Sequence, residues 1–247
     1  MAESAQVRIA LILCSVLERE VALHGGGDPH VVVRRQLEMG LHDAPDLLRE
    51  RLQAEIDALE AEESGAFDVI VLVYGLCGMG ADGLRAGKHP LVIARAHDCF
   101  THLLGSLSEY ERRMAERPDC HFYSPGWNQA RRVPGPERLE LLKAEFSARF
   151  SPEDAEYLVE TEAALWKART QGVHIDLGTA DAEAEAGYAC RCCAWLGWSF
   201  ERVRGDPTLL RDLLHGPWDD ARFQVVPPGA TLRFTRDARI FKAVGNP

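Results

Sequence analysis

The chain has 247 residues, of which 46% are hydrophobic, and its formal net charge at pH 7 is −10. A chain of this length and apolar content can bury a core that is stable without disulfides. The acidic balance argues against a nucleic-acid or membrane-surface binder, because both classes rely on a basic surface. We therefore expect the partner to be a small molecule or another protein.

The start of the chain lacks the pattern of a secretory signal, and no apolar run reaches the ~20 residues that a bilayer crossing needs. These features predict a cytoplasmic protein without membrane association. The sequence contains seven cysteines. In a reducing compartment such cysteines are more often metal ligands, nucleophiles or buried apolar groups than disulfide partners. Each cysteine therefore needs its own explanation.

Apolar, β-branched runs predict the strands of the chain. They occupy residues 7–13, 67–74, 91–94 and 173–177, and their continuous hydrophobicity is typical of strands covered on both faces. Helical segments lie between them, and this alternation predicts an α/β fold with a mostly parallel, doubly wound sheet and helices on both faces. We expect one α/β domain over residues 1–247.

Periodicity and capping residues predict several helical regions. Residues 15–23 follow the first strand, with Ser15 as the expected N-cap. Residues 30–63 carry apolar side chains at intervals of three and four, so we expect helix there, broken by Pro45. Residues 134–170 are predicted to form a helix-rich insertion, in which a pair of helices interrupts the α/β pattern.

Three cysteines follow predicted strands. Cys14 ends the first strand, Cys77 lies in the turn after the second, and Cys99 follows the third. Because ligands bind at the carboxyl ends of strands in open α/β sheets, we expect these thiols to bind a metal. Three thiolates suit zinc with an open fourth position, or a [4Fe-4S] cluster with one iron free for substrate. The alternative is that they are small buried side chains without a ligand.

The segment that leads to Cys99 places several polar and charged side chains at one strand end. We expect catalytic roles for Arg95, His97 and Asp98: Arg95 would orient a carboxylate or phosphate, and His97 would move a proton or bind the metal. A closed, structural zinc site would instead take its fourth ligand from His97, His42 or Asp98. Arg95 could also form a local ion pair, and Asp98 could simply cap a helix.

The turn around Cys77 is rich in glycine. Gly75, Gly78 and Gly80 would let backbone N–H groups approach an anion or the sulfurs of a cluster, so we expect them to bind the cofactor. Trp127 ends a second strand-to-loop exit and could form a pocket wall over the thiols. Its alternative role is that of a loop aromatic that covers the edge of the sheet.

The remaining cysteines have weaker patterns. Cys190, Cys192 and Cys193 form a compact run that could bind a second metal or exchange thiols. The simpler interpretation is a buried, cysteine-rich turn. Cys120 stands alone in the sequence, and we expect a structural role for it.

Several short motifs of the chain belong together. They are Cys14, Gly40-Leu-His42, Tyr74-Gly-Leu-Cys-Gly, Arg95-Ala-His-Asp-Cys99 followed by Leu103-Leu-Gly-Ser106, and Ser124-Pro-Gly-Trp127. In this combination the chain resembles, over residues 7–235, the bacterial and archaeal family called domain of unknown function 1638. The resemblance implies an intracellular α/β domain, a metal or cluster, and an association with one-carbon and corrinoid-dependent methyl metabolism.

The first functional hypothesis is a metal- or cluster-dependent enzyme, a transferase or lyase of methyl-transfer or small-acid metabolism, with a small-molecule substrate. The second is a non-catalytic metal-binding accessory protein that docks on a corrinoid protein or methyltransferase. The third is a small-molecule binding module whose cysteines hold no metal. Metal content and turnover separate these hypotheses.

Overall fold

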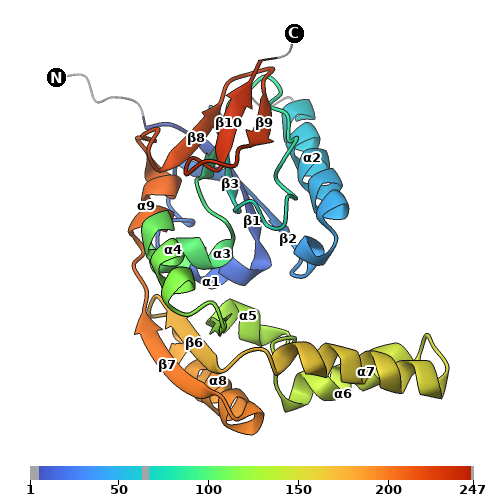
Figure 1. Ribbon diagram of the computed structural model, residues 1–247. Helices are drawn as coiled ribbons and strands as arrows, with labels where there is room; N and C mark the ends of the chain where they lie inside the picture. Colours follow the sequence, from blue (N-terminus) through green and yellow to red (C-terminus); the bar gives the residue numbers. More distant parts are fainter. Residues whose placement is uncertain (1–5, 63–66, 246–247) are drawn as a thin grey trace. The chain divides into compact units, whose positions relative to one another are not determined.

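The computed structural model describes residues 6–62 and 67–245, and these form two compact units (Figure 1). The five-stranded unit contains the described residues up to Tyr110 and from Asp206 onward. The three-stranded unit is Glu111–Gly205. Two compact units can belong to one domain or to two, so the single domain over residues 1–247 stays a prediction. Across the described ranges, no helix combines the length and apolarity that a bilayer span requires.

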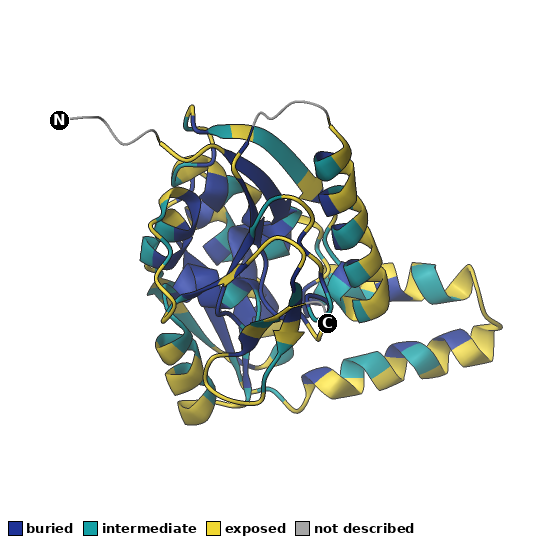
Figure 2. Ribbon diagram, turned by 90° about the horizontal axis from the view of Figure 1, so that it is seen from above, coloured by how far each residue is buried: buried dark blue, intermediate teal, exposed yellow. Residues whose placement is uncertain are grey.

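The five-stranded unit is built on a sheet with the order β2-β1-β3-β4-β8. The first four strands run parallel, and β8 pairs with β4 in the antiparallel direction. Their bounds are β1 Ile9–Cys14, β2 Val31–Leu37, β3 Val69–Val73, β4 Leu91–Ala94 and β8 Phe223–Val226. Every residue of β1, β3 and β4 is buried, as expected for strands covered on both faces (Figure 2).

The other elements of this unit connect and cover the sheet. Helix α2 turns Leu48, Leu52, Ile56 and Leu59 inward and leaves its other side exposed (Figure 2). A short antiparallel pair, β9 with β10, follows β8. The bounds are η1 Ser15–Leu17, α1 Glu18–Leu23, η2 Leu41–Asp43, α2 Pro45–Ala61, α3 Cys99–Leu104, α9 Thr208–His215, β9 Thr231–Phe234 and β10 Phe241–Val244. Helix α4, Leu107–Glu116, begins in this unit and ends in the other.

The helix predicted over residues 30–44 is wrong, because this segment contains β2. Its run of β-branched valines, Val31–Val33, favours a strand, and backbone pairing with β1 outweighs the helical spacing of the leucines. Pro45 starts α2 rather than breaking a helix, in the position where its missing N–H is not needed. Ser15 is not an N-cap either, since it opens η1 and no side chain caps that turn.

The three-stranded unit has a parallel sheet in the order β5-β6-β7. The predicted insertion over residues 134–170 consists of α6 and α7, which lie side by side between β5 and β6 in the chain (Figure 1). The bounds are β5 Cys120–Tyr123, α5 Pro125–Gln129, α6 Pro136–Ser147, α7 Pro152–Trp166, β6 Gln171–Asp176, α8 Ala182–Leu196 and β7 Ser199–Arg204. A mixed α/β architecture with mostly parallel sheets is therefore confirmed.

The cysteine run of α8 contributes to the core of the three-stranded unit. Cys192 and Cys193 are buried among Tyr123 and Trp198, whereas Cys190 is exposed. Burial raises the pKa of Cys193 to about 11 and raises that of Cys192 as well. Both core thiols are therefore neutral at pH 7 and pack as small apolar groups.

Gly172 in β6 leaves room for this core. A Cβ added there would lie 2.2 Å from the sulfur of Cys193 and 2.8 Å from the ring of Tyr123. We expect Gly172→Ala to lower the free energy of unfolding by about 1–3 kcal/mol, because the core has no space for the methyl group. Chemical denaturation measures this. Gly187→Ala on α8 meets ordinary contacts and should raise stability by up to about 1 kcal/mol.

Candidate metal centre

The structure places the three predicted cysteine ligands at one end of the five-stranded sheet. Cys14 is the last residue of β1, Cys77 lies in the turn after β3, and Cys99 opens α3 after β4. Because β1, β3 and β4 are adjacent and parallel, these three strand ends meet at the same edge. The residues are only 8%, 8% and 4% exposed, in chain order.

The thiols of these cysteines lie near enough to influence one another's protonation. Cys99 interacts with both Cys14 and Cys77, and these interactions, together with burial, raise the pKa of Cys99 well above its usual range. The interaction with Cys99 lowers the pKa of Cys14 despite burial. The arrangement therefore prepares Cys14 to be the first thiolate of the group.

Backbone contacts bring the turn of Cys77 against the chain that leads to Cys99. The N–H of Leu76 donates to Ala96 O and that of Cys77 donates to His97 O, both at 2.9 Å. Gly75 makes this approach possible, since a Cβ there would lie 2.7 Å from the backbone nitrogen of Asp98. Of the three glycines expected to bind the cofactor, Gly75 thus has a clear structural task beside the thiols.

Gly78 and Gly80 allow the same turn to pack closely against neighbouring elements. A Cβ at Gly80 would lie 2.4 Å from the side chain of Leu48 on α2. Gly78 has a φ of +65° and lies beside the backbone carbonyl of His42. The η2 turn of His42 therefore borders the turn that carries Cys77, although the imidazole itself pairs with Asp43 at 3.3 Å. Cofactor binding by Gly78 and Gly80 stays a prediction.

Tyr74 is a site residue that the cysteine pattern did not reveal. Its buried hydroxyl lies beside the sulfur of Cys14 and makes no hydrogen bond of regular geometry with any described residue. Burial raises its pKa, so the hydroxyl keeps its proton and remains a donor. An aromatic residue directly after a buried strand and before Gly75 was the available signal.

A buried histidine supports the backbone beneath the thiols. His102 on α3 is fully buried and its Nε2 donates to the carbonyl of Tyr74 at 3.1 Å. Burial lowers its pKa to about 4, so it is neutral at pH 7. The bond joins α3, which begins at Cys99, to the end of β3.

The side chain of Arg95 points towards the C-terminal segment of the chain. Its side chain is 2% exposed, and a guanidinium has five N–H donors. All five have acceptors at 2.6–3.0 Å, namely Asp220 O, Asp220 Oδ1, Gln224 Oε1, Arg239 O and Phe241 O. Arg95 therefore joins the end of β4 to β8 and β10, and a substrate-binding role would require these bonds to break.

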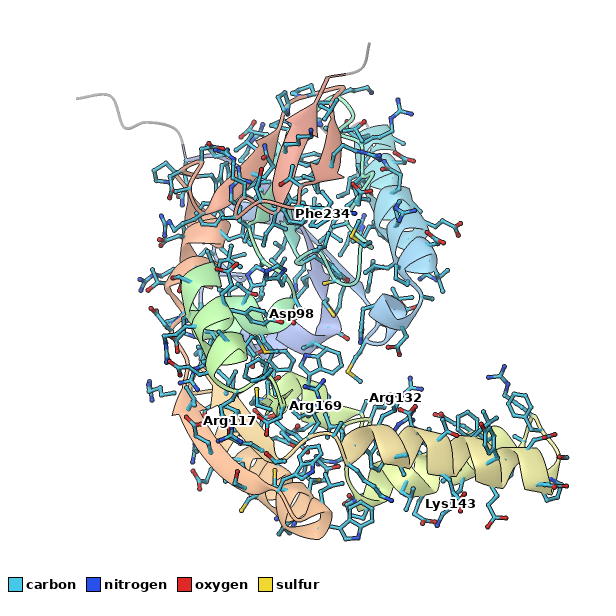
Figure 3. The ribbon with its side chains drawn as sticks, viewed as in Figure 1. Asp98, Arg117, Arg132, Lys143, Arg169 and Phe234 are labelled. Atoms are coloured by element: carbon cyan, nitrogen blue, oxygen red, sulfur yellow. The ribbon has the colours of Figure 1, made fainter. Side chains whose placement is uncertain are left out.

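Asp98 and His97 lie beside Tyr110, and Figure 3 labels Asp98 at the start of α3. The Asp98 carboxylate caps that helix by accepting from the N–H groups of Phe100 and Thr101. It also accepts from the Tyr110 hydroxyl at 2.9 Å. The ring of His97 packs on Tyr110 with centroids 5.5 Å apart. The capping role of Asp98 is thus present, while catalysis by either residue stays a prediction.

Trp127 belongs to the three-stranded unit, whereas the cysteines belong to the five-stranded unit. It lies on the short helix α5, where its backbone N–H donates to the N-cap Ser124 at 3.3 Å. Its expected role as a wall over the thiols stays a prediction.

The donor set of this site fits a thiophilic metal. Three buried thiols that converge are soft ligands, and the Tyr74 hydroxyl beside Cys14 makes no hydrogen bond of regular geometry with a described residue. A metal-bound thiolate at Cys14 would supply the missing acceptor. The burial of a polar hydroxyl at this place is costly without such a partner.

The role of Arg95 can be tested by a charge-conserving change. Arg95→Lys keeps the positive charge but cannot reach five acceptors, so we expect a loss of about 3 kcal/mol in unfolding free energy. Metal content should not change, because the five hydrogen-bond acceptors of the guanidinium are oxygen atoms and not thiols. Arg8→Lys, in an exposed pair with Asp68, should leave stability nearly unchanged. The structural role of Arg95 would be contradicted if Arg95→Lys kept the unfolding free energy of the wild type but no longer bound its ligand.

Comparison with models of protein families gives a match. The model of a family described as protein of unknown function (DUF1638) matches residues 36–214. No curated protein and no solved structure matches the chain. The matched region includes two of the three clustered cysteines, Cys77 and Cys99, and it covers most of the sequence. The chain is therefore a member of the DUF1638 family.

Proposed function

We propose that this protein is an enzyme that holds an iron–sulfur cluster or a zinc ion through Cys14, Cys77 and Cys99. The observation that carries the proposal is the convergence of three buried thiols at the carboxyl ends of three adjacent parallel strands. Ligand sites in open α/β sheets lie at this edge. With three protein ligands, one coordination position is open, as in catalytic rather than structural sites.

The spread of the sulfurs favours a [4Fe-4S] cluster over zinc. Thiolates bound to one zinc at ~2.3 Å in tetrahedral geometry lie about 3.8 Å apart. Among the described residues, the three cysteines do not form a group whose ligand atoms all lie within 4.8 Å of one another. A cluster binds each thiolate to a different iron, which suits ligands that are further apart.

The open position defines the chemistry that we propose. A cluster iron there would act as a Lewis acid towards a hydroxyl or carboxylate of a small acid, and zinc would activate a thiol for methyl transfer. Both reactions fit a transferase or lyase. His97, half-buried at the same strand end, is the proton carrier in this proposal. Arg95 and Asp98 have secondary roles in this proposal, because their polar atoms already form hydrogen bonds within the protein.

We infer a doubly wound sheet around this site.

Anaerobic purification tests the metal site. We expect about four iron and four sulfide per chain, with the broad absorption of a cluster, and near-complete loss of both in Cys77→Ala. Cys192→Ala is the matched control, because it removes a buried thiol from the other unit and should retain the iron. Stoichiometric zinc would select the zinc site instead. A metal-free protein under these conditions would refute the proposal, and bound metal without turnover would indicate an accessory protein.

Tyr74 provides a finer test of the cluster. Tyr74→Phe removes the hydroxyl beside Cys14 and should keep the iron content while it lowers the reduction potential, because hydrogen bonds to ligand sulfurs raise that potential. Protein-film voltammetry measures the shift. The control Tyr123→Phe removes a buried hydroxyl that donates to Pro134 O, and the potential should stay unchanged. Equal potentials in all three proteins would show that Tyr74 does not reach the cluster.

A further inference from the structure

A second group of metal-binding side chains lies in the five-stranded unit, away from the cysteines. A carboxylate oxygen of Asp28, a ring nitrogen of His30 and a ring nitrogen of His215 all lie within 4.8 Å of one another. In the part of the chain that the structure describes, this is the one group of three His, Cys, Asp or Glu side chains gathered so closely. Asp28 and His30 precede β2, and His215 ends α9.

Backbone carbonyls determine which nitrogens are available as ligands. His30 Nε2 lies 2.9 Å from Leu214 O, and His215 Nδ1 lies 2.7 Å from Arg211 O. A carbonyl only accepts, so these two contacts favour the tautomers in which His30 Nε2 and His215 Nδ1 carry the proton. In these tautomers the lone pairs are on His30 Nδ1 and His215 Nε2. Metal-binding histidines are oriented in this way, with the second nitrogen donating to a carbonyl or carboxylate.

The contact between Asp28 and His215 requires a proton or a metal ion between the two side chains. Asp28 Oδ2 lies 2.8 Å from His215 Nε2. If His215 carries its only proton on Nδ1, the lone pair of Nε2 faces a carboxylate oxygen, and two acceptors at this distance repel each other. A proton or a metal ion must lie between them. A proton satisfies these two groups alone, whereas a metal ion also uses the nearby His30.

The end of α9 adds negative potential at the same place. The last carbonyls of a helix carry partial negative charge and favour cations. Those of Arg211 and Leu214 accept from the two imidazoles. The loop before His30 allows the rings to come this close, because a Cβ at Gly25 would lie 2.3 Å from the ring of His215.

This group lies at the amino edge of the sheet. Ile9, the first residue of β1, donates its N–H to the carbonyl of His30 at 2.7 Å. The cysteine group lies at the other end of the same strand, since Cys14 is its last residue. Five steps of ~3.3 Å along β1 separate the two edges by about 16 Å. The two groups cannot share one metal ion.

We propose that Asp28, His30 and His215 bind a divalent transition-metal ion, through two imidazole nitrogens and one carboxylate oxygen. This donor set suits Zn²⁺ or Fe²⁺ and leaves at least one position for water or substrate. The site is independent of the cysteine centre. Asp28 is half-exposed and His215 about one-third exposed, so an ion can enter from solvent.

Zinc titration of the full chain tests this site. After chelator treatment and removal of any affinity tag, calorimetry with Zn²⁺ should show a binding event that persists in Cys77→Ala. Asp28→Asn should weaken this event at least about tenfold, because the neutral amide is a poor ligand. The Asn side chain keeps nearly the same shape, so the fold should survive. His30→Ala should abolish the event.

The matched control is His89→Ala. His89 forms a similar pair with Glu60 at 3.1 Å, but these residues belong to no group of three close donors among the described residues. Its zinc binding should equal that of the wild type. The proposal is overturned if Asp28→Asn binds zinc with wild-type affinity and stoichiometry. It is also overturned if no event remains in Cys77→Ala. Neither result bears on iron content at the cysteines.

Discussion

The close approach of two backbone segments at Gly75 is the constraint on which the cysteine centre depends. The turn after β3 lies against the end of β4 so tightly that no side chain fits between them. Two hydrogen bonds, to Ala96 O and His97 O, extend the pairing of β3 and β4 beyond the regular strands. Cys77 is thereby held beside Cys99, and the parallel register of β1 brings Cys14 to the same edge.

The two edges of this sheet offer different chemistry. The carboxyl edge presents buried thiols, which are soft ligands, whereas the amino edge presents imidazoles and a carboxylate near solvent. Between them β1, β3 and β4 are entirely apolar, so no polar side chain of these strands links the edges. The two edges of one sheet therefore offer ligand sets of different metal preference.

Polar residues in a conspicuous motif need not all serve the same purpose. Arg95 and Asp98 stand beside Cys99 in the sequence, yet Arg95 binds carbonyls of the C-terminal segment and Asp98 caps α3. Tyr74, an ordinary aromatic residue at a strand end, has its hydroxyl beside Cys14. Spacing in sequence gives the element on which a residue lies, but the direction of a side chain depends on neighbours that come from distant segments.

The sequence by itself determined the buried strands, the positions of Cys14, Cys77 and Cys99 at their ends, and the helical insertion, because continuous apolar runs and capping residues are local signals. It misassigned β2, since an edge strand with charged residues has a pattern close to that of a helix. Only the tertiary structure decided which strands are neighbours, where Arg95 points, and that His215 meets Asp28 and His30. Those contacts join residues far apart in the chain, and no local pattern encodes them.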